Sequence, residues 1–133
     1  MIKFLNNEHK ERFNRCIEQD ETYEYDFERK SLFYILSGND DLYRRIEDIY
    51  DFDDRSINLD IILNKSHELS SAARKMLSLG LNLYNNFKYK DFNSSDYSTL
   101  ELFAGLDEFN FELCIRALRI RFDMSGKGVE DWK

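Results

Sequence analysis

Three aspartates stand close together at Asp51, Asp53 and Asp54, and clustered carboxylates can hold a divalent cation. The spacing begins like a calcium-binding loop, but the fifth, sixth and twelfth positions carry Arg, Ser and Ile where such a loop needs an oxygen ligand, Gly and Glu. The pattern therefore does not predict a calcium loop. A metal-dependent nuclease or hydrolase that uses these carboxylates stays open as an alternative function.

The side chains most used in catalysis are scarce: His9 and His67 are the only histidines, and Cys16 and Cys114 the only cysteines. His67 is followed by Glu68, but the HExxH zinc motif fails because residue 71 is Ser. We expect His9 to be exposed in the first turn of a helix, and both cysteines to lie on apolar helix faces without a basic neighbour. No phosphate-binding glycine motif occurs. We therefore predict a protein that is not an enzyme and has no cofactor.

The negative charge is concentrated in one half of the chain. Residues 1–68 contain 17 Asp and Glu against 10 Lys and Arg, which equals the whole net charge of −7. Such a surface repels phosphate backbones, so nucleic-acid binding is disfavoured, while a basic protein surface would be attracted. A further alternative is a helix-turn-helix DNA-binding regulator in which Gly38 connects the two helices. Its second helix would carry Arg44 and Arg45. The acidic residues around those arginines count against it.

Eight tyrosines are more than a small core can supply with hydroxyl partners, so several should lie at the surface, where tyrosine is typical of protein interfaces. We predict a non-catalytic accessory protein that binds a basic protein surface. The candidate binding residues are acidic residues and tyrosines of the middle of the chain: Tyr43, Glu47, Asp48, Tyr50, Asp51, Asp53, Asp54, Tyr89 and Tyr97.

Capping residues and apolar spacing predict the elements that must position these side chains. A first helix runs over about 8–18 after Asn7, and a central helix follows Asp26 and ends at Gly38 as a C-terminal cap. A third helix covers 40–50 after Asn39 or Asp40. Further helices begin after Ser70 or Ser71, after Ser98 and after Asp107, and residues 85–97 form a long loop. Gly80, inside the fourth helix, predicts close approach of another helix.

Residues 56–63 give an ambiguous pattern, because alternating Ile57, Leu59 and Ile61 fit a strand as well as a packed loop. A strand here would need a neighbour within the chain or a copy of itself across a two-fold axis. Monomer and homodimer therefore both stay open.

The chain has 133 residues, 42% of them hydrophobic, and no proline, which suits one mainly helical domain. We predict an all-α fold of five to six helices over residues 1–122, with one short β segment near 56–63 as an option. Residues 123–133 are expected to form a flexible tail in which Trp132 is either without a role or a docking anchor. No membrane span or secretory leader is visible, so we expect a cytoplasmic protein.

Four stretches together resemble a known family: KSLFYILSGNDDLY (Lys30–Tyr43), IYDF (Ile49–Phe52), LSSAARKMLSLGLNLYNN (Leu69–Asn86) and LFAGLDEFNFELCIRALRIRF (Leu102–Phe122). They are similar to small, uncharacterised proteins of phages, prophages and genomes of Gram-positive bacteria. The resemblance implies a short accessory gene on a mobile element. Small accessory phage proteins often act by binding one host protein, so we expect an inhibitor of a host protein such as a defence component. It carries over no catalytic residue.

Overall fold

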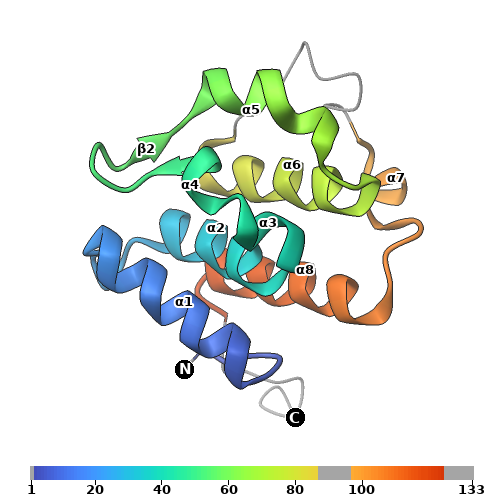
Figure 1. The fold of residues 1–133 in the computed structure, drawn as a ribbon. Helices are drawn as coiled ribbons and strands as arrows, with labels where there is room; N and C mark the ends of the chain where they lie inside the picture. Colours follow the sequence, from blue (N-terminus) through green and yellow to red (C-terminus); the bar gives the residue numbers. More distant parts are fainter. Residues whose placement is uncertain (1, 87–96, 125–133) are drawn as a thin grey trace, which may run out of the picture.

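The computed structural model describes residues 2–86 and 97–124, and these residues are mainly helical. They form eight α-helices, one 3₁₀ turn and one two-stranded sheet. Figure 1 shows the order along the chain: α1 (Asn7–Asp20), α2 (Phe27–Gly38), α3 (Asp40–Arg44), α4 (Ile46–Ile49), β1 (Tyr50–Asp51), β2 (Ser56–Ile57), α5 (Leu59–Lys65), η1 (Ser66–Glu68), α6 (Ser71–Asn85), α7 (Thr99–Phe103) and α8 (Glu108–Arg121). The predicted all-α class is confirmed.

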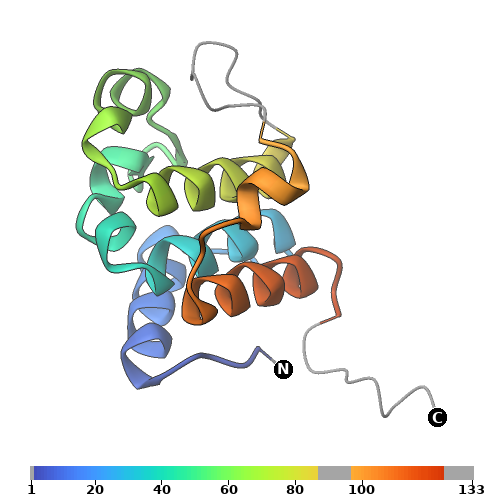
Figure 2. The same cartoon turned by 90° about the vertical axis from the view of Figure 1, so that its right-hand side faces the viewer.

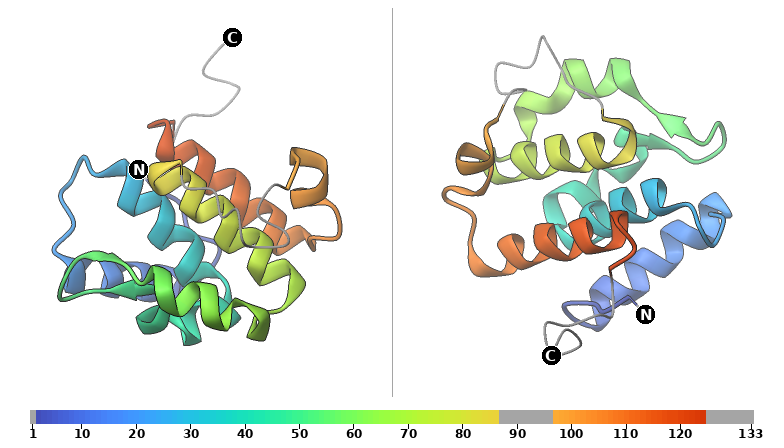
Figure 3. Two further views of the ribbon diagram at one scale, coloured as in Figure 1. Left: turned by 90° about the horizontal axis from the view of Figure 1, so that it is seen from above. Right: turned by 180° about the vertical axis from the view of Figure 1, so that it is seen from behind.

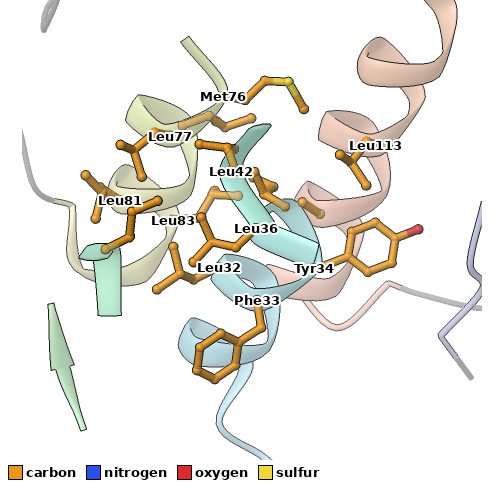
Figure 4. Close-up of a cluster of buried hydrophobic side chains, with 14 of the residues drawn as sticks. Leu32, Phe33, Tyr34, Leu36, Leu42, Met76, Leu77, Leu81, Leu83 and Leu113 are labelled. Carbon is orange, nitrogen blue, oxygen red and sulfur yellow. The ribbon is translucent and has the colours of Figure 1, made fainter. Parts of the chain in front are cut away.

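Helix α2 is the centre of the fold. It packs most extensively against α6 and α8 and then against α1, and Figures 1 and 2 show these three helices around it. Every residue from Ser31 to Ser37 is buried, which explains why this helix is apolar on all sides. Figure 4 shows its side chains between leucines of α6 on one side and Leu113 of α8 on the other.

Glycines on two helices allow this close packing. A Cβ on Gly80 would lie 3.2 Å from Leu32 Cδ1, so α6 approaches α2 closely, as its glycine predicts. A Cβ on Gly38 would lie 2.3 Å from Leu113 Cδ1, and Gly38 does not have a left-handed φ. Its role as a C-terminal cap is therefore wrong: Gly38 makes room for α8, and Asn39 caps the helix end.

Helix starts follow the capping residues. The side chains of Asp26, Ser70 and Asp107 each accept a hydrogen bond from a backbone N–H of the helix that follows, and Ser98 forms a capping box with Glu101. The first helix begins one residue earlier than expected, because Asn6 rather than Asn7 is its cap.

Helices α1 and α8 end in the same way, with a residue other than glycine in the left-handed region. Glu21 has φ 55° and Asp123 has φ 56°. The N–H groups of Glu21 and Thr22 bond to the carbonyls of Glu18 and Ile17, which is a Schellman motif. Of the expected flexible tail 123–133, the N–H groups of Asp123 and Met124 donate to the Ile120 and Arg119 carbonyls, and residues 125–133 lie outside the described residues.

The middle of the chain departs most from expectation, which is why eight helices replace the predicted five to six. The single helix expected over 40–50 is two short helices, α3 and α4, separated at Arg45. Residues 56–63 divide: Ser56 and Ile57 pair with Asp51 and Tyr50 in an antiparallel hairpin, and a short helix follows from Leu59. The alternation of apolar residues was therefore only in part a strand signal.

Candidate functional site

The candidate surface is built on the hairpin between α4 and α5. Tyr50 and Asp51 pair with Ile57 and Ser56, and Asn58 extends this pairing by donating its N–H to the Ile49 carbonyl. The Asn58 side chain also donates to the Glu47 carbonyl at 3.0 Å. Residues 47–60 are therefore one connected unit, which we call the acidic hairpin. Figure 3 shows it projecting at one side of the helical body.

Its turn is shaped by its own carboxylates. Asp51 Oδ1 accepts the backbone N–H groups of Asp53 and Asp54, both at 3.0 Å. Asp54 Oδ2 accepts the Ser56 hydroxyl at 2.7 Å. Arg55, with φ 56°, supplies the left-handed residue of the turn. Two of the three clustered aspartates thus hold the turn, which is a common use of aspartate in loops.

The acidic hairpin is attached to the helical body by a buried carboxylate. Asp20, at the end of α1, is 1% exposed and accepts the Tyr50 hydroxyl at 2.6 Å. Arg55 donates to it from Nε at 3.2 Å, and Thr22 from its hydroxyl at 2.6 Å. Burial alone raises the pKa of Asp20, but the hydrogen bonds from Arg55, Thr22 and Tyr50 outweigh it, and the pKa lies below its ordinary value.

Arg29 of α2 completes this network. Its Nε donates to the Tyr50 hydroxyl at 3.0 Å, its Nη1 to Asp26 at 2.9 Å and its Nη2 to the Arg55 carbonyl at 3.0 Å. Tyr50 is fully buried, and burial, together with the bond to Asp20, raises its pKa. Sequence reasoning missed Asp20, Arg29 and Arg55 as a group, because they come from three separate segments and share no spacing pattern.

The remaining predicted tyrosines do not gather at the acidic hairpin. The guanidinium carbon of Arg12 lies 4.6 Å from the centre of the Tyr43 ring. The Tyr43 hydroxyl accepts a hydrogen bond from Arg15 of α1. Tyr97 lies beside Lys75 on the α6 and α7 side. Tyr50 is an interior residue, so its place in an exposed binding surface is wrong. Tyr89 lies outside the described residues.

The acidic side chains of the hairpin lie close together along the chain and differ in their surroundings from the acidic residues that flank them. Ion pairs hold Glu8 and Asp40 to Arg12, Asp41 to Arg44 and Arg45, and Glu68 to Arg45. Within residues 2–86 and 97–124, no ion pair reaches six acidic side chains of residues 47–60: Glu47, Asp48, Asp51, Asp53, Asp54 and Asp60. Asp60 had not been predicted as part of the surface; it joins because α5 follows the hairpin directly.

These carboxylates do not form a compact metal-binding group. In the described part of the chain, no three His, Cys, Asp or Glu side chains come together as ligands for one ion. The arginines of the alternative DNA-binding helix are also engaged, since Arg44 pairs with Asp41, and Arg45 with Asp41 and Glu68. That helix, α3, has only five residues. Neither alternative gains support from the geometry.

The expectation that His9 is exposed is wrong. His9 is 2% exposed; its Nε2 donates to the Tyr34 carbonyl at 3.0 Å, and its Nδ1 accepts the Leu5 N–H at 3.4 Å. Burial lowers its pKa to about 4, so the ring is neutral at pH 7. Cys16 and Cys114 are buried as expected, and burial raises the pKa of each thiol to about 12. Such thiols are poor nucleophiles.

A comparison with known families places the chain. Residues 1–131 match the model of DUF6075, described as a family of unknown function. The chain belongs to this family. No curated protein and no solved structure matches it. Membership of DUF6075 agrees with the predicted resemblance to uncharacterised proteins and assigns no activity to any residue. No helix within the described ranges has the length and apolar character needed to cross a membrane.

Proposed function

We propose that the protein is a non-catalytic binding module whose acidic hairpin engages a basic surface on another protein. The observation that carries the proposal is the set of six carboxylates on residues 47–60 that lack an ion-pair partner among the described residues. Their backbone is fixed to the body by Asp20, Tyr50, Arg29 and Arg55. A rigid, unneutralised acidic surface attracts cationic partners and loses little conformational entropy on binding.

The finer part of the proposal concerns the setting. The resemblance to small proteins of phages and prophages of Gram-positive bacteria suggests an accessory protein of a mobile element that acts in the host cytoplasm. Its partner would be a host protein, and the candidate class is a component of a defence system that has a basic surface. Inhibition by occupying that surface requires no catalysis. The neutral buried histidine and the protonated buried thiols support this non-catalytic role.

The test is capture of partners from a lysate of a Gram-positive bacterium by the full chain and by two matched variants. One variant carries Glu47→Lys, Asp53→Lys and Asp60→Lys, three exposed residues of the acidic hairpin. The control carries Glu11→Lys, Glu18→Lys and Glu24→Lys, exposed residues outside it. Each set changes the net charge by 3 × 2, from −7 to −1, so only the location differs.

The expected result is one dominant protein, identified by mass spectrometry, that the wild type and the control capture at low salt. High salt should release it, because exposed charges are screened within about 8–10 Å at physiological ionic strength. The hairpin variant should lose it. Equal capture by both variants, or no protein captured by the wild type at low salt, would contradict the proposal.

A further inference from the structure

A groove of about 620 Å³ opens between the N-terminal segment, α1, the start of α2 and the end of α8. Its apolar lining consists of Ile2, Phe4, Phe13, Tyr25, Phe27 and Ile120. It lies apart from the acidic hairpin, and no part of the proposed binding function uses it. Its size is within the range of about 300–1,000 Å³ that is typical of ligand pockets.

The walls of the groove are well anchored. The Tyr34 hydroxyl donates to the Lys3 carbonyl at 2.6 Å, which holds the N-terminal segment against α2. The centre of the Phe4 ring lies 5.2 Å from that of Phe13 and 5.3 Å from that of His9. On the other wall, the centre of the Tyr25 ring lies 6.3 Å from that of Phe27, and Tyr25 is 61% exposed. The groove is thus a stable aromatic surface with an uncovered edge.

The end of α8 delivers the chain to this groove. Asp123 lines it, and its neighbours Phe122 and Met124 are 64% and 51% exposed. Figure 2 shows this end of α8 close to the N-terminal residues. Exposed apolar side chains thus stand beside the groove at the point where the described chain ends, next to an exposed tyrosine of its lining.

We propose that the occupant is the chain's own segment 125–133, SGKGVEDWK, docking through Trp132. Trp132 lies eight positions after Met124, and an extended chain over eight positions reaches about 26 Å. Gly126 and Gly128 give this segment backbone conformations that other residues rarely adopt, so it can bend towards the groove. An indole ring among phenylalanine and tyrosine rings buries a large apolar area and gains from edge contacts with them.

Charge supports the same occupant. Lys10 and Lys30 line the groove, and the residues directly before Trp132 are Glu130 and Asp131. The Lys30 ammonium donates to the Glu24 carbonyl, and Lys10 has no ion pair within the described ranges. Glu24 and Asp123 also line the groove, so the cations lie on only part of its rim. Docking of the segment would bring the carboxylates of Glu130 and Asp131 close to the two lysines of the groove.

Trp132 is the only tryptophan, so the intrinsic fluorescence of the full chain reports this position alone. We expect its emission to be blue-shifted and its quenching by acrylamide to be reduced, compared with a synthetic peptide of residues 125–133. Tyr25→Ala should shift the emission back towards that of the peptide. The matched control Phe109→Ala, which removes a 41% exposed ring at the opposite end of α8, should leave it unchanged.

Two results with the wild-type protein would overturn the proposal. The first is a wild-type Trp132 that is as red-shifted and as readily quenched as in the peptide. The second is protection that disappears on dilution, which would mean that the segment docks into a second copy. A charge exchange sharpens the test: Lys10→Glu should increase quenching, and adding Asp131→Lys should reverse that increase. If Lys10→Glu and Tyr25→Ala both leave Trp132 protected, this groove is not its site.

Discussion

Asp20 and Asp53 are both acidic residues of the same negatively charged half of the chain, yet their surroundings are opposite. Asp20 is 1% exposed and accepts hydrogen bonds from Tyr50, Thr22 and Arg55. Asp53 is exposed on the acidic hairpin, with no ion pair in the described part of the chain. The difference teaches that charge in this sequence has two uses. Buried charge attaches the hairpin, and exposed charge is available for the binding that we propose.

The largest expected effect comes from removing the buried member. Asp20→Ala leaves the Tyr50 and Thr22 hydroxyls without their acceptor, whereas Arg55 is 45% exposed and can be solvated. Each unsatisfied buried hydroxyl costs about 1–3 kcal/mol, so we expect a total loss of about 3 kcal/mol. Urea unfolding followed by circular dichroism measures this loss. The matched change Asp53→Ala should alter the free energy of unfolding by no more than about 0.5 kcal/mol, as is usual at exposed positions. Similar losses of stability in the two variants would contradict the difference between the buried Asp20 and the exposed Asp53.

Acid should affect a second buried group before it affects the hairpin attachment. Burial lowers the pKa of His9 to about 4, whereas an unfolded chain binds this proton near pH 6.5. Its contribution to stability is therefore complete above pH 6.5 and decreases as pH falls to 4, by about 3 kcal/mol. Denaturant unfolding across this range measures the decrease. His9→Gln, which cannot be protonated, should remove most of the slope.

The attachment through Asp20 should respond at lower pH. Because the folded-state pKa of Asp20 lies below its ordinary value of about 3.9, its contribution is present above that pH and is lost as pH falls further. Stability that stays constant between pH 6.5 and 4 in the wild type would contradict the assignment of His9 as a neutral buried ring.

Tyrosine hydroxyls offer a smaller test of the same contrast. Tyr50→Phe removes the donor to Asp20 and the acceptor of Arg29, both inside the protein, and should cost about 1–2 kcal/mol in the free energy of unfolding. Tyr43→Phe removes only an acceptor for Arg15 at the surface and should cost less than about 0.5 kcal/mol. Equal costs would show that the interior network contributes no more than a surface contact.

The smallest effect is a gain, and it concerns the residue next to Asp20. Glu21 is exposed with φ 55°, a conformation that costs a residue with a side chain about 1 kcal/mol. Glu21→Gly should therefore stabilise the protein by about 0.5–1 kcal/mol in thermal or urea unfolding. Glu18→Gly, inside the same helix, is the control and should destabilise it by about 1 kcal/mol. A loss at Glu21 would show that its carboxylate has an unrecognised role.

Local sequence signals determined the fold class and most helix starts. Asp26, Ser70, Ser98 and Asp107 each cap the helix that follows them, because a capping side chain bonds a backbone N–H only a few residues away. The apolar run of α2 likewise predicted a central helix, since a helix without a polar face must be buried. These signals depend on neighbours in the chain and need no knowledge of the rest of the fold.

Other features were decided only by contacts between distant segments. His9 looks like an exposed residue at a helix start until the Tyr34 carbonyl and the N-terminal segment cover it. Tyr50 looks like a surface tyrosine until Asp20, thirty positions away, accepts its hydroxyl. Burial and pairing across such separations depend on how the helices pack, which no local pattern records. The sequence by itself therefore determined where helices begin, and the tertiary structure decided which of its charges are buried or paired and which stay exposed.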